Sequence, residues 1–453
     1  MEVLENRSAG TKRYEEHVNP HWARLLEVLE MNVRYVRCAG SELFDETGRR
    51  YLDFLSGYCV HNAGHNHPAI VQALKCELDR QGPAILQSHV AELAGELGAR
   101  LCALAGGRLE KVFFCSSGCE GVEAAIKFAR AYTGRGGMIC ASGAFHGLTC
   151  GALSLMDGAF WRDGFGPLLE DVTTVPFGDL TALETHLRLR RAAAFIVEPV
   201  QAEAGICLPP AGYLQEAQRL CRKYGSLFVL DEVQTGMFRT GAFLAAHRYG
   251  VDPDIVILAK ALSGGLIPCG AVRMSNAVYD SVYGSLKRSL VHTSTFSENN
   301  LAMRAGIATL DVLEREELGK CAERVGDCFA QPAARNTCWL RNDPRHPRGW
   351  SFERNCFSRP AQTEHSRGVR IVRGVSSRGV RAACGNATVP RPRNSHADLW
   401  QQLSVLKAAP PLSISEAQLE EFVRAVRPVV ELIHSSASFW TDALGLARRA
   451  VNI

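Results

Sequence analysis

The first segment with chemical potential is a run of small residues at 116–121, Ser-Ser-Gly-Cys-Glu-Gly. It follows the apolar run KVFFC and precedes VEAAIKFARAY, whose apolar residues recur with helical spacing. Small residues at a strand-to-helix turn let backbone N–H groups converge on one point, and the positive end of the helix attracts a phosphate. The run is neither GxGxxG nor a Walker loop, which argues against a dinucleotide or a nucleoside triphosphate. It indicates a phosphate site, although many such turns bind nothing.

Two charged residues lie at the ends of apolar segments. Asp231 ends SLFVLD and Lys260 ends DIVILAK. A charge at the tip of a buried strand costs free energy without a partner, so one interpretation is a structural ion pair. In the other, a cofactor lies between them, with its protonated ring nitrogen against Asp231 and its carbonyl carbon bonded to Lys260. Burial would lower the pKa of the lysine amine and favour Schiff-base formation. Phosphate, ring nitrogen and aldehyde together indicate pyridoxal phosphate (PLP).

Longer motifs surround these residues. The stretch LDEVQTGMFRTG is followed, 29 positions after its Asp, by the Lys of DIVILAKALSGG. The other motifs are GSELFDETGRRYLDFLSGY, GHNHP, FFCSSGCEGVEAAIKFAR, AFHG, VEPVQAEAG, HTSTFSENNLA and APPL. The chain resembles the class III aminotransferases, which include ornithine, acetylornithine and other omega-amino acid aminotransferases. The resemblance covers most of residues 40–320 and again 403–434, and it implies a fold type I PLP-dependent transferase.

The resemblance implies roles in holding the cofactor. Lys260 would bond to the aldehyde and move the proton, while Asp231 would keep the pyridine nitrogen protonated; these two are the catalytic pair. Phe145 and Val233 would cover the ring faces, unless they are plain core residues, and Gln234 would bond near the phenolic oxygen. The cofactor-binding positions are Ser117, Gly118, Cys119, Phe145, His146, Glu198, Asp231, Val233, Gln234, Lys260 and Thr295.

The resemblance also implies three substrate-binding positions, Glu203, Lys407 and Tyr58. Glu203 resembles an acid that pairs with a substrate-binding Arg and releases it for an alpha-carboxylate. Lys407 stands where the family often has that Arg, and a Lys cannot offer a bidentate fork. Other departures are Val122, where Asn is usual, and Ser297-Glu298, where a Gly pair is usual. Of these departures, Lys407 is the one that bears on how the chain recognises a carboxylate.

The activity implied by the resemblance is transfer of an amino group from an amine to a 2-oxo acid. The expected donor is ornithine, acetylornithine, a diamine or another omega-amine, and the expected acceptor is 2-oxoglutarate. Thr295 would reach the phosphate of a neighbouring subunit, which implies a homodimer with shared active sites. A PLP decarboxylase or aminomutase of the same fold is an alternative, because it would keep all of these cofactor contacts.

The interval 331–400 sets the charge of the chain. It holds thirteen Arg, no Lys and four acidic residues, whereas the whole chain has a formal charge of +4. Its lack of periodicity indicates a disordered insertion or, as we favour, an out-of-frame coding segment. An arm for nucleic acid is the third interpretation, and we expect no nucleic-acid partner. If the interval replaces strands of a small domain, the product would be catalytically impaired or only a binding protein.

Composition excludes several classes of protein. The chain has 453 residues, 46% of them hydrophobic, which is enough for a large core. It has no apolar run of the ~20 residues that span a bilayer, and its N-terminus does not resemble a secretory signal. We therefore expect a cytoplasmic protein without membrane contact, its 16 Cys being reduced thiols. His65 and His67 lack further ligands at metal spacing, so we expect no metal.

The remaining patterns predict an α/β fold. A hairpin is expected at 40–56, strands at 111–117, 137–145, 192–200, 226–233 and 254–262, and helices at 67–81, 91–105, 213–225, 299–330 and 416–434. Short apolar strands between helices predict a mostly parallel sheet covered on both faces. We expect a large PLP-binding domain at 57–320 and a smaller α+β domain formed by 1–56 and 321–453. Ligands should then bind at the carboxyl ends of the strands.

Overall fold

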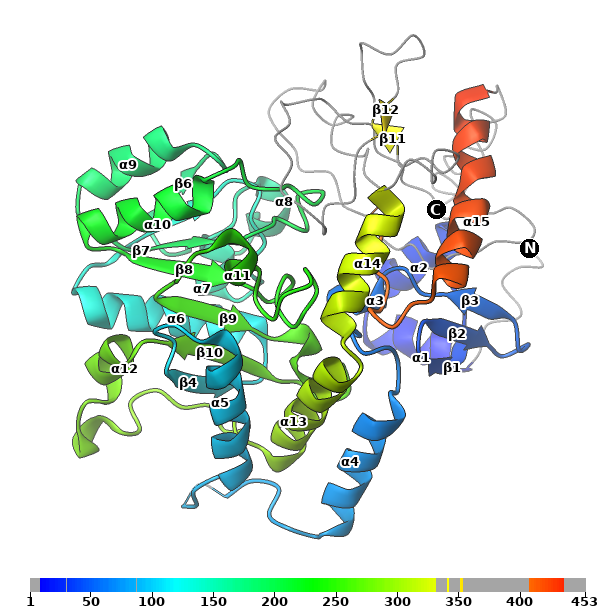
Figure 1. Cartoon of the computed structure of the whole chain (residues 1–453), viewed down its shortest axis with the longest axis horizontal. Helices are drawn as coiled ribbons and strands as arrows, with labels where there is room; N and C mark the ends of the chain where they lie inside the picture. The colour runs from blue at the N-terminus through cyan, green and yellow to red at the C-terminus, as the bar shows by residue number, and fades with distance from the viewer. Residues whose placement is uncertain are drawn as a thin grey trace.

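The computed structural model describes residues 9–29, 31–86, 88–330, 340–341, 351–352 and 407–435 (Figure 1). The Arg-rich interval 331–400 lies outside these residues, except for β11 (Leu340–Arg341) and β12 (Ser351–Phe352), which pair antiparallel. None of the helices in the described part has a segment long and apolar enough to cross a bilayer.

A seven-stranded sheet forms the centre of the larger part of the structure. Its order is β4 (Lys111–Cys115), β10 (Gly270–Met274), β9 (Ile255–Leu258), β8 (Leu227–Asp231), β7 (Ala192–Val197), β5 (Gly137–Ala141) and β6 (Val172–Val175). β10 is antiparallel to both of its neighbours, and all other pairs are parallel. The expected mostly parallel sheet is confirmed, although the apolar runs do not predict β6 or β10.

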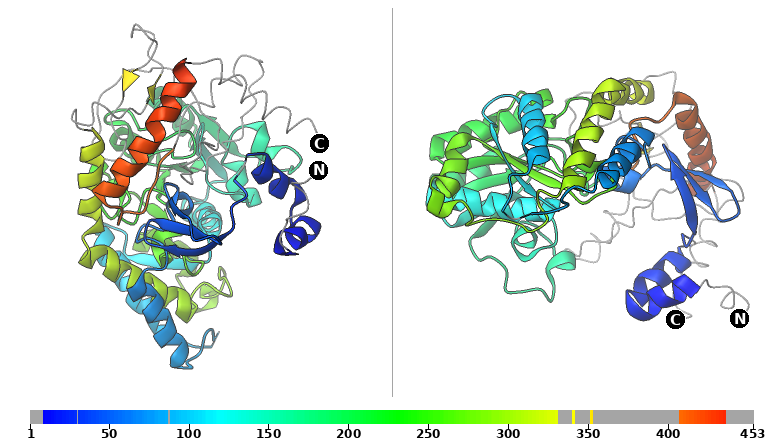
Figure 2. Two further views of the ribbon diagram at one scale, coloured as in Figure 1. Left: turned by 90° about the vertical axis from the view of Figure 1, so that its right-hand side faces the viewer. Right: turned by 90° about the horizontal axis from the view of Figure 1, so that it is seen from below.

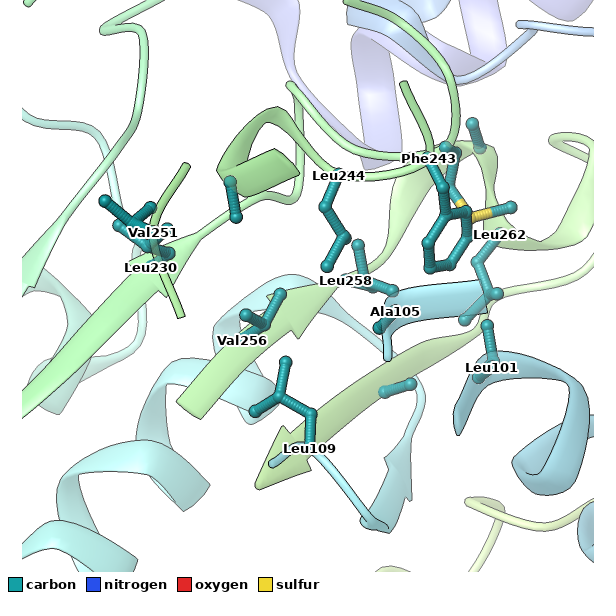
Figure 3. Close-up of a cluster of buried hydrophobic side chains, with 14 of the residues drawn as sticks. Leu101, Ala105, Leu109, Leu230, Phe243, Leu244, Val251, Val256, Leu258 and Leu262 are labelled. Atoms are coloured by element: carbon teal, nitrogen blue, oxygen red, sulfur yellow. The ribbon is translucent and has the colours of Figure 1, made fainter. Parts of the chain in front are cut away.

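Helices cover both faces of this sheet. Along β8 the side chains alternate: Leu227 and Val229 join a core cluster with α6 (Gly118–Thr133) and α12 (Asn276–Tyr283). Leu230 joins the cluster on the opposite face, where Figure 3 shows it near Val256 and Leu258 of the neighbouring strand. That cluster includes residues of α5 (Glu92–Ala105), α9 (Leu180–Arg188), α10 (Tyr213–Tyr224) and α13 (Asn300–Arg315). Because both faces are buried, polar groups emerge at the strand ends.

A separate three-stranded antiparallel sheet contains β1 (Tyr35–Ala39), β2 (Glu42–Asp45) and β3 (Arg50–Leu52) (Figure 2). The expected hairpin is β2 with β3, and its turn is held by Asp45 Oδ1, which accepts the N–H of Thr47 and of Arg49 at 2.9 Å each. α1 (Ala9–His17) and α2 (Pro20–Val28) precede this sheet, whereas α4 (Pro68–Asp79) packs on α13.

A small core joins this sheet to the last described helices. Leu52 of β3 clusters with Val325 of α14 (Leu318–Ala330) and with apolar residues of α15 (Glu416–Ser435). The rings of Phe54 and Phe422 stack there with 3.6 Å between their centroids. Segments that are far apart in the sequence therefore pack together around one core.

Candidate active site

The polar residues at the strand ends gather in a cavity of about 500 Å³. Asp231 ends β8, Glu198 follows β7, and Lys260 opens the 3-10 helix η2 (Lys260–Ser263), which begins two residues after β9 ends. The cavity is lined by Ser117, Gly118, Cys119, Phe145, His146, Glu198, Asp231, Val233, Gln234 and Lys260. The structure thus brings together every expected cofactor position except Thr295, which is exposed and does not line the cavity.

The N-terminus of α6 forms one wall of this cavity. Ser117 is the N-cap, and its Oγ accepts the N–H of Glu120 at 3.2 Å, while Glu120 Oε2 accepts the N–H of Ser116 at 3.1 Å. A Cβ at Gly118 would lie 3.0 Å from Val233 Cγ2, so a side chain here would fit only if Val233 shifted. The N–H groups of Gly118 and Cys119 precede the first hydrogen-bonded position of the helix and are free to bind an anion.

Asp231 binds His146 rather than Lys260. Its Oδ2 lies 2.7 Å from Nδ1 of the imidazole, and its Oδ1 accepts the N–H of Val233 at 3.1 Å. Burial disfavours a charge on His146, but the hydrogen bond to Asp231 and the charges of Asp231 and Glu198 together outweigh it and raise the pKa of the imidazole. The carboxylate therefore has a hydrogen-bond partner on one side and lines the cavity on the other.

Glu198 is a second buried acid of the site. Its Oε1 accepts the N–H of Phe145 at 2.9 Å, which fixes the loop after β5. Burial, together with the nearby charge of Asp231, raises the pKa of its carboxyl to about 7, although His146 acts in the opposite direction. This acid therefore changes its protonation state near neutral pH rather than near pH 4.5.

Lys260 combines an unusual backbone with a depressed pKa. Its φ of +46° lies in the left-handed region, which residues other than glycine rarely adopt. Burial lowers the pKa of its amine, and the charge of Lys407 lowers it further, whereas Cys59 and Glu203 act in the opposite direction. The neutral form of such an amine is a nucleophile for a carbonyl carbon.

Two of the three expected substrate residues, Lys407 and Glu203, form a closed ring of hydrogen bonds with Gln234. Lys407 Nζ donates to Glu203 Oε1 and to Gln234 Oε1, each at 2.6 Å, and Gln234 Nε2 donates to Glu203 Oε1 at 3.1 Å. Despite burial, which raises it, the pKa of Glu203 is lowered by the charge of Lys407. The ring centroid of Tyr58 lies 5.5 Å from Lys407 Nζ. Gln234 lines the cavity, whereas Lys407, Glu203 and Tyr58 lie behind it and do not line it. Residues up to 204 positions apart in the chain meet here.

Tyr58 belongs to a left-handed turn, α3 (Ser56–Cys59), in which all four residues have positive φ. Asp53 Oδ1 accepts the N–H of Leu55 and of Ser56 at 2.8 Å each, and the Ser56 hydroxyl donates to the carbonyl of Ala409 at 2.6 Å. The turn is therefore held from both sides, and one of its anchors is the APPL segment that follows Lys407.

Arg239 is a site residue that sequence analysis misses. It is 4% exposed, donates to the carbonyl of Pro410 at 2.7 Å, and also donates to the Asn62 side chain. It thereby joins the loop after β8 to the APPL segment. Its position within the motif MFRTG gives a charged residue among apolar ones, which is the one signal that could have found it.

The two histidines of GHNHP make hydrogen bonds in their loop. His65 Nε2 lies 2.7 Å from Asp53 Oδ2, and His67 Nδ1 accepts the N–H of Ala69 at 3.3 Å as the N-cap of α4. Each of the two imidazoles therefore has a hydrogen-bond partner within this region.

Comparison with known proteins identifies the family of the chain. The family model described as aminotransferase class-III matches residues 26–335. The chain belongs to the class III aminotransferase family. Aminotransferase PigE of Serratia sp. (strain ATCC 39006) is 39% identical over 320 residues, which are 70% of this chain and 38% of PigE. The chain thus spans well under half the length of this relative.

Solved class III structures share the fold. The acetylornithine aminotransferase from Elizabethkingia anophelis is 30% identical over 91% of this chain and 99% of its own, with a TM-score of 0.66. An amine transaminase from an uncultivated Pseudomonas species, solved in its PLP-bound form, is 26% identical over 87% of this chain and 94% of its own, with a TM-score of 0.68. The fold type I assignment and PLP as the family cofactor are thereby confirmed. The free N–H groups of α6, the carboxylate of Asp231 and the amine of Lys260 fit this cofactor.

Proposed function

We propose that the chain is an aminotransferase that moves an amino group from an omega-amine or amino acid, of the ornithine, acetylornithine or diamine type, to 2-oxoglutarate. The observation that carries the proposal is the placement of Asp231 and Lys260 at the ends of neighbouring strands, in a cavity that α6 also lines with its N-terminus. A carboxylate, an amine and an anion site in one cavity match the three polar parts of PLP.

When bound, PLP supplies an aldehyde carbon that bonds to amines and a protonated ring that withdraws electrons from the reacting carbon. Gly118 and Cys119 would hold its phosphate by their N–H groups, and Phe145 and Val233 would cover its ring. Asp231 would keep the ring nitrogen protonated, and the hydrogen bond from His146 fixes that carboxylate in place. Gln234 would lie near the phenolic oxygen, with Ser117 and Glu198 supporting the loops.

Lys260 would perform the proton transfer of the reaction. Its Nζ would accept the proton from the substrate carbon that bears the amine and would donate it to the carbonyl carbon of the cofactor. Such a general base works best when its pKa lies near the working pH, and burial shifts the pKa of Lys260 in that direction.

Glu203, Lys407 and Tyr58 would contact the substrate at the other end of the cavity. A carboxylate of the oxo acid would have to compete with Glu203 for Lys407, since the two are paired in this structure.

We also infer a homodimer with shared active sites. Thr295 lies in an exposed segment with large apolar side chains, including Leu290 at 79% and Phe296 at 62% exposure. A second subunit would cover such side chains, and it would bring Thr295 to the phosphate of its neighbour.

We keep the division into a large domain at 57–320 and a small domain from 1–56 and 321–453 as part of the proposal. The core around Phe54 and Phe422 supports it. The free cysteines support a cytoplasmic location.

A visible spectrum of the purified protein tests the proposal. A yellow absorption band should disappear on borohydride reduction, be absent in Lys260→Ala and persist in the control Lys75→Ala, which alters an exposed lysine of α4. A folded wild-type protein that stays colourless with added PLP would contradict the proposal.

Product analysis separates the alternatives that share these contacts. Amine donors should consume 2-oxoglutarate and yield glutamate. Release of carbon dioxide without amino transfer would identify a decarboxylase, and rearrangement of the donor an aminomutase. A coloured protein that converts no amine would be the catalytically impaired product.

A further inference from the structure

Glu120, the third residue of α6, connects two parts of the structure. Its Oε2 accepts the N–H of Ser116, which lines the cavity, at 3.1 Å, and the same oxygen accepts the hydroxyl of Ser294 at 3.3 Å. Ser294 lies 174 positions further along the chain, directly before Thr295. One carboxylate therefore joins the wall expected to hold the phosphate to the segment that carries Thr295.

On the side of the cavity, Glu120 helps to fix the start of α6. Ser117 Oγ accepts the N–H of Glu120 at 3.2 Å, while Glu120 accepts the N–H of Ser116. These two side chains hold the turn whose free N–H groups, those of Gly118 and Cys119, would bind the phosphate. A displacement of Glu120 would therefore alter the position of the phosphate site.

On the other side, the contact with Ser294 anchors a tight turn at 294–297. The Ser294 carbonyl accepts the N–H of Ser297 at 3.2 Å and its hydroxyl at 2.9 Å. Thr295 and Phe296 form the tip of this turn, and both are exposed. In the proposed dimer the tip would contact the partner subunit, with Thr295 at the phosphate of the partner's cofactor.

A second contact attaches the same segment to α6. Lys127 Nζ lies 2.7 Å from Nδ1 of His292, and the imidazole packs on the ring of Phe113 with 4.5 Å between the centroids. Lys127 follows Glu120 by about two turns of the helix, so both residues lie on one face of α6. The helix thus holds the segment at two points, and the point at Glu120 is the one that also contacts the cavity wall.

From these contacts we propose that Glu120 is a positioning residue that links the two cofactor sites of the dimer. In its own subunit it fixes the N–H groups that would hold the phosphate, and through Ser294 it places Thr295 for the phosphate of the partner. The inference rests on the proposed function, and in particular on the homodimer with shared active sites. A single side chain would therefore affect cofactor binding in both subunits.

Mixed dimers separate these two actions. Subunits with different affinity tags are combined so that one of them, the silent subunit, carries Lys260→Ala. The yellow band then reports PLP in the other, the reporter subunit. Each further substitution is placed in one subunit at a time, and the dissociation constant of PLP for the reporter is measured by equilibrium titration of the apo dimer.

Glu120→Ala should raise this constant ~10-fold or more from either subunit, as expected for the loss of a hydrogen bond to a charged group. In the reporter it loosens the wall, and in the silent subunit it releases the turn that serves the reporter. Ser294→Ala leaves the contacts of Ser116 and Ser117 in place, so it should act only from the silent subunit. Glu120→Gln keeps an oxygen for both donors and should lie close to the wild type from either subunit.

Ser289→Ala is the matched control in the same segment. The Ser289 hydroxyl is exposed and donates to the carbonyl of Leu286 at 2.9 Å, so its loss should have no effect from either subunit.

Two patterns would overturn the inference alone in a yellow dimer. In the first, the effect of Glu120→Ala or of Ser294→Ala is confined to the subunit that carries the substitution; in the second, both variants match Ser289→Ala. If Glu120→Ala fails to fold, Ser294→Ala still decides. A wild type that sediments as a monomer, or that stays colourless with added PLP, would overturn the proposed function together with this inference.

Discussion

Nδ1 of His146 lies 2.7 Å from Oδ2 of Asp231, and the two side chains are 3% and 5% exposed. The other ring nitrogen, Nε2, is buried without a hydrogen-bond partner among the described residues. A buried imidazole held in this way fixes the carboxylate and supports its negative charge, which is what a protonated ring nitrogen requires.

Asp231→Asn tests the role of that negative charge. The amide cannot keep a ring nitrogen protonated, so we expect the amine half-reaction to slow by ~100-fold or more, the scale seen when a preorganised electrostatic group is removed. Asp311→Asn, at an exposed acid that pairs with Arg100, is the control and should retain the wild-type rate. A wild-type rate in Asp231→Asn would exclude this role.

Glu198→Gln should change how stability depends on pH. In the folded protein its pKa is about 7, against an ordinary value of 4.5. Because the folded-state pKa is the higher one, the protonated form stabilises the fold at low pH, and this contribution is lost as the pH rises towards 7. The loss amounts to ~3 kcal/mol, and Gln, which is always neutral, would not show it.

Calorimetry of the apoprotein between pH 4.5 and 8 measures this difference. The melting temperature of Glu198→Gln should match that of the wild type at the acid end and exceed it increasingly up to about pH 7. Glu96→Gln, at an exposed position of α5, should follow the wild type. Parallel curves for Glu198→Gln and wild type would show that this acid titrates normally.

Gly118→Ala should weaken cofactor binding. The new methyl group would lie 3.0 Å from Val233 Cγ2, so Val233, which lines the cavity, would have to shift. We expect the dissociation constant of PLP to rise by ~10-fold, equivalent to about 1.4 kcal/mol, when measured by equilibrium titration of the apoprotein.

Gly98→Ala is the matched control for that substitution. The nearest atom to its Cβ would be 3.9 Å away, and the position lies within α5, where Ala stabilises a helix by about 0.5–1 kcal/mol relative to Gly. It should therefore raise the melting temperature and leave PLP binding unchanged. Equal effects of the two substitutions on PLP would contradict a steric role for Gly118.

Phe422→Ala should separate stability from cofactor binding. Phe422 is 1% exposed and stacks on Phe54, so its loss should cost about 3–5 kcal/mol of folding free energy. The backbone N–H of Ala409 donates to the carbonyl of Phe54 at 2.7 Å, so a shift of Phe54 should also displace the segment after Lys407. We expect a higher KM for the amine and an unchanged dissociation constant for PLP. Leu78→Ala, at a side chain 61% exposed, should alter neither.

The parallel strands could be predicted because their residues are nearly all apolar, but β10 could not. Arg273 lies in the middle of β10 and is fully buried, with its guanidinium donating to the carbonyls of Leu101 and Leu109. A charged residue interrupts the apolar run on which strand prediction depends. β6 was missed for a different reason, since Thr173 and Thr174 are not buried and the strand lies at the sheet edge.

In the candidate site, too, some residues have a local signal in the sequence and others do not. Asp231 and Lys260 stand out in the sequence because each ends an apolar segment, which is a local signal. Lys407 has no local signal of this kind and stands out only as a departure from a family pattern. Its pairing with Glu203 and Gln234 depends on a fold that joins residues 204 and 173 positions apart, and no local spacing encodes such contacts.

The left-handed turn at Ser56–Cys59 has a consequence for biosynthesis. A left-handed conformation costs roughly 1–2 kcal/mol for each residue other than glycine, and one of its anchors, the Ala409 carbonyl, is translated 353 residues after Ser56. The emerging polypeptide can pair the strands that carry Asp231 and Lys260 well before that anchor leaves the ribosome. The hydrogen bond from Ser56 to that carbonyl can form only afterwards, so the turn that carries Tyr58 gains this anchor later than the strands of the cofactor end are made.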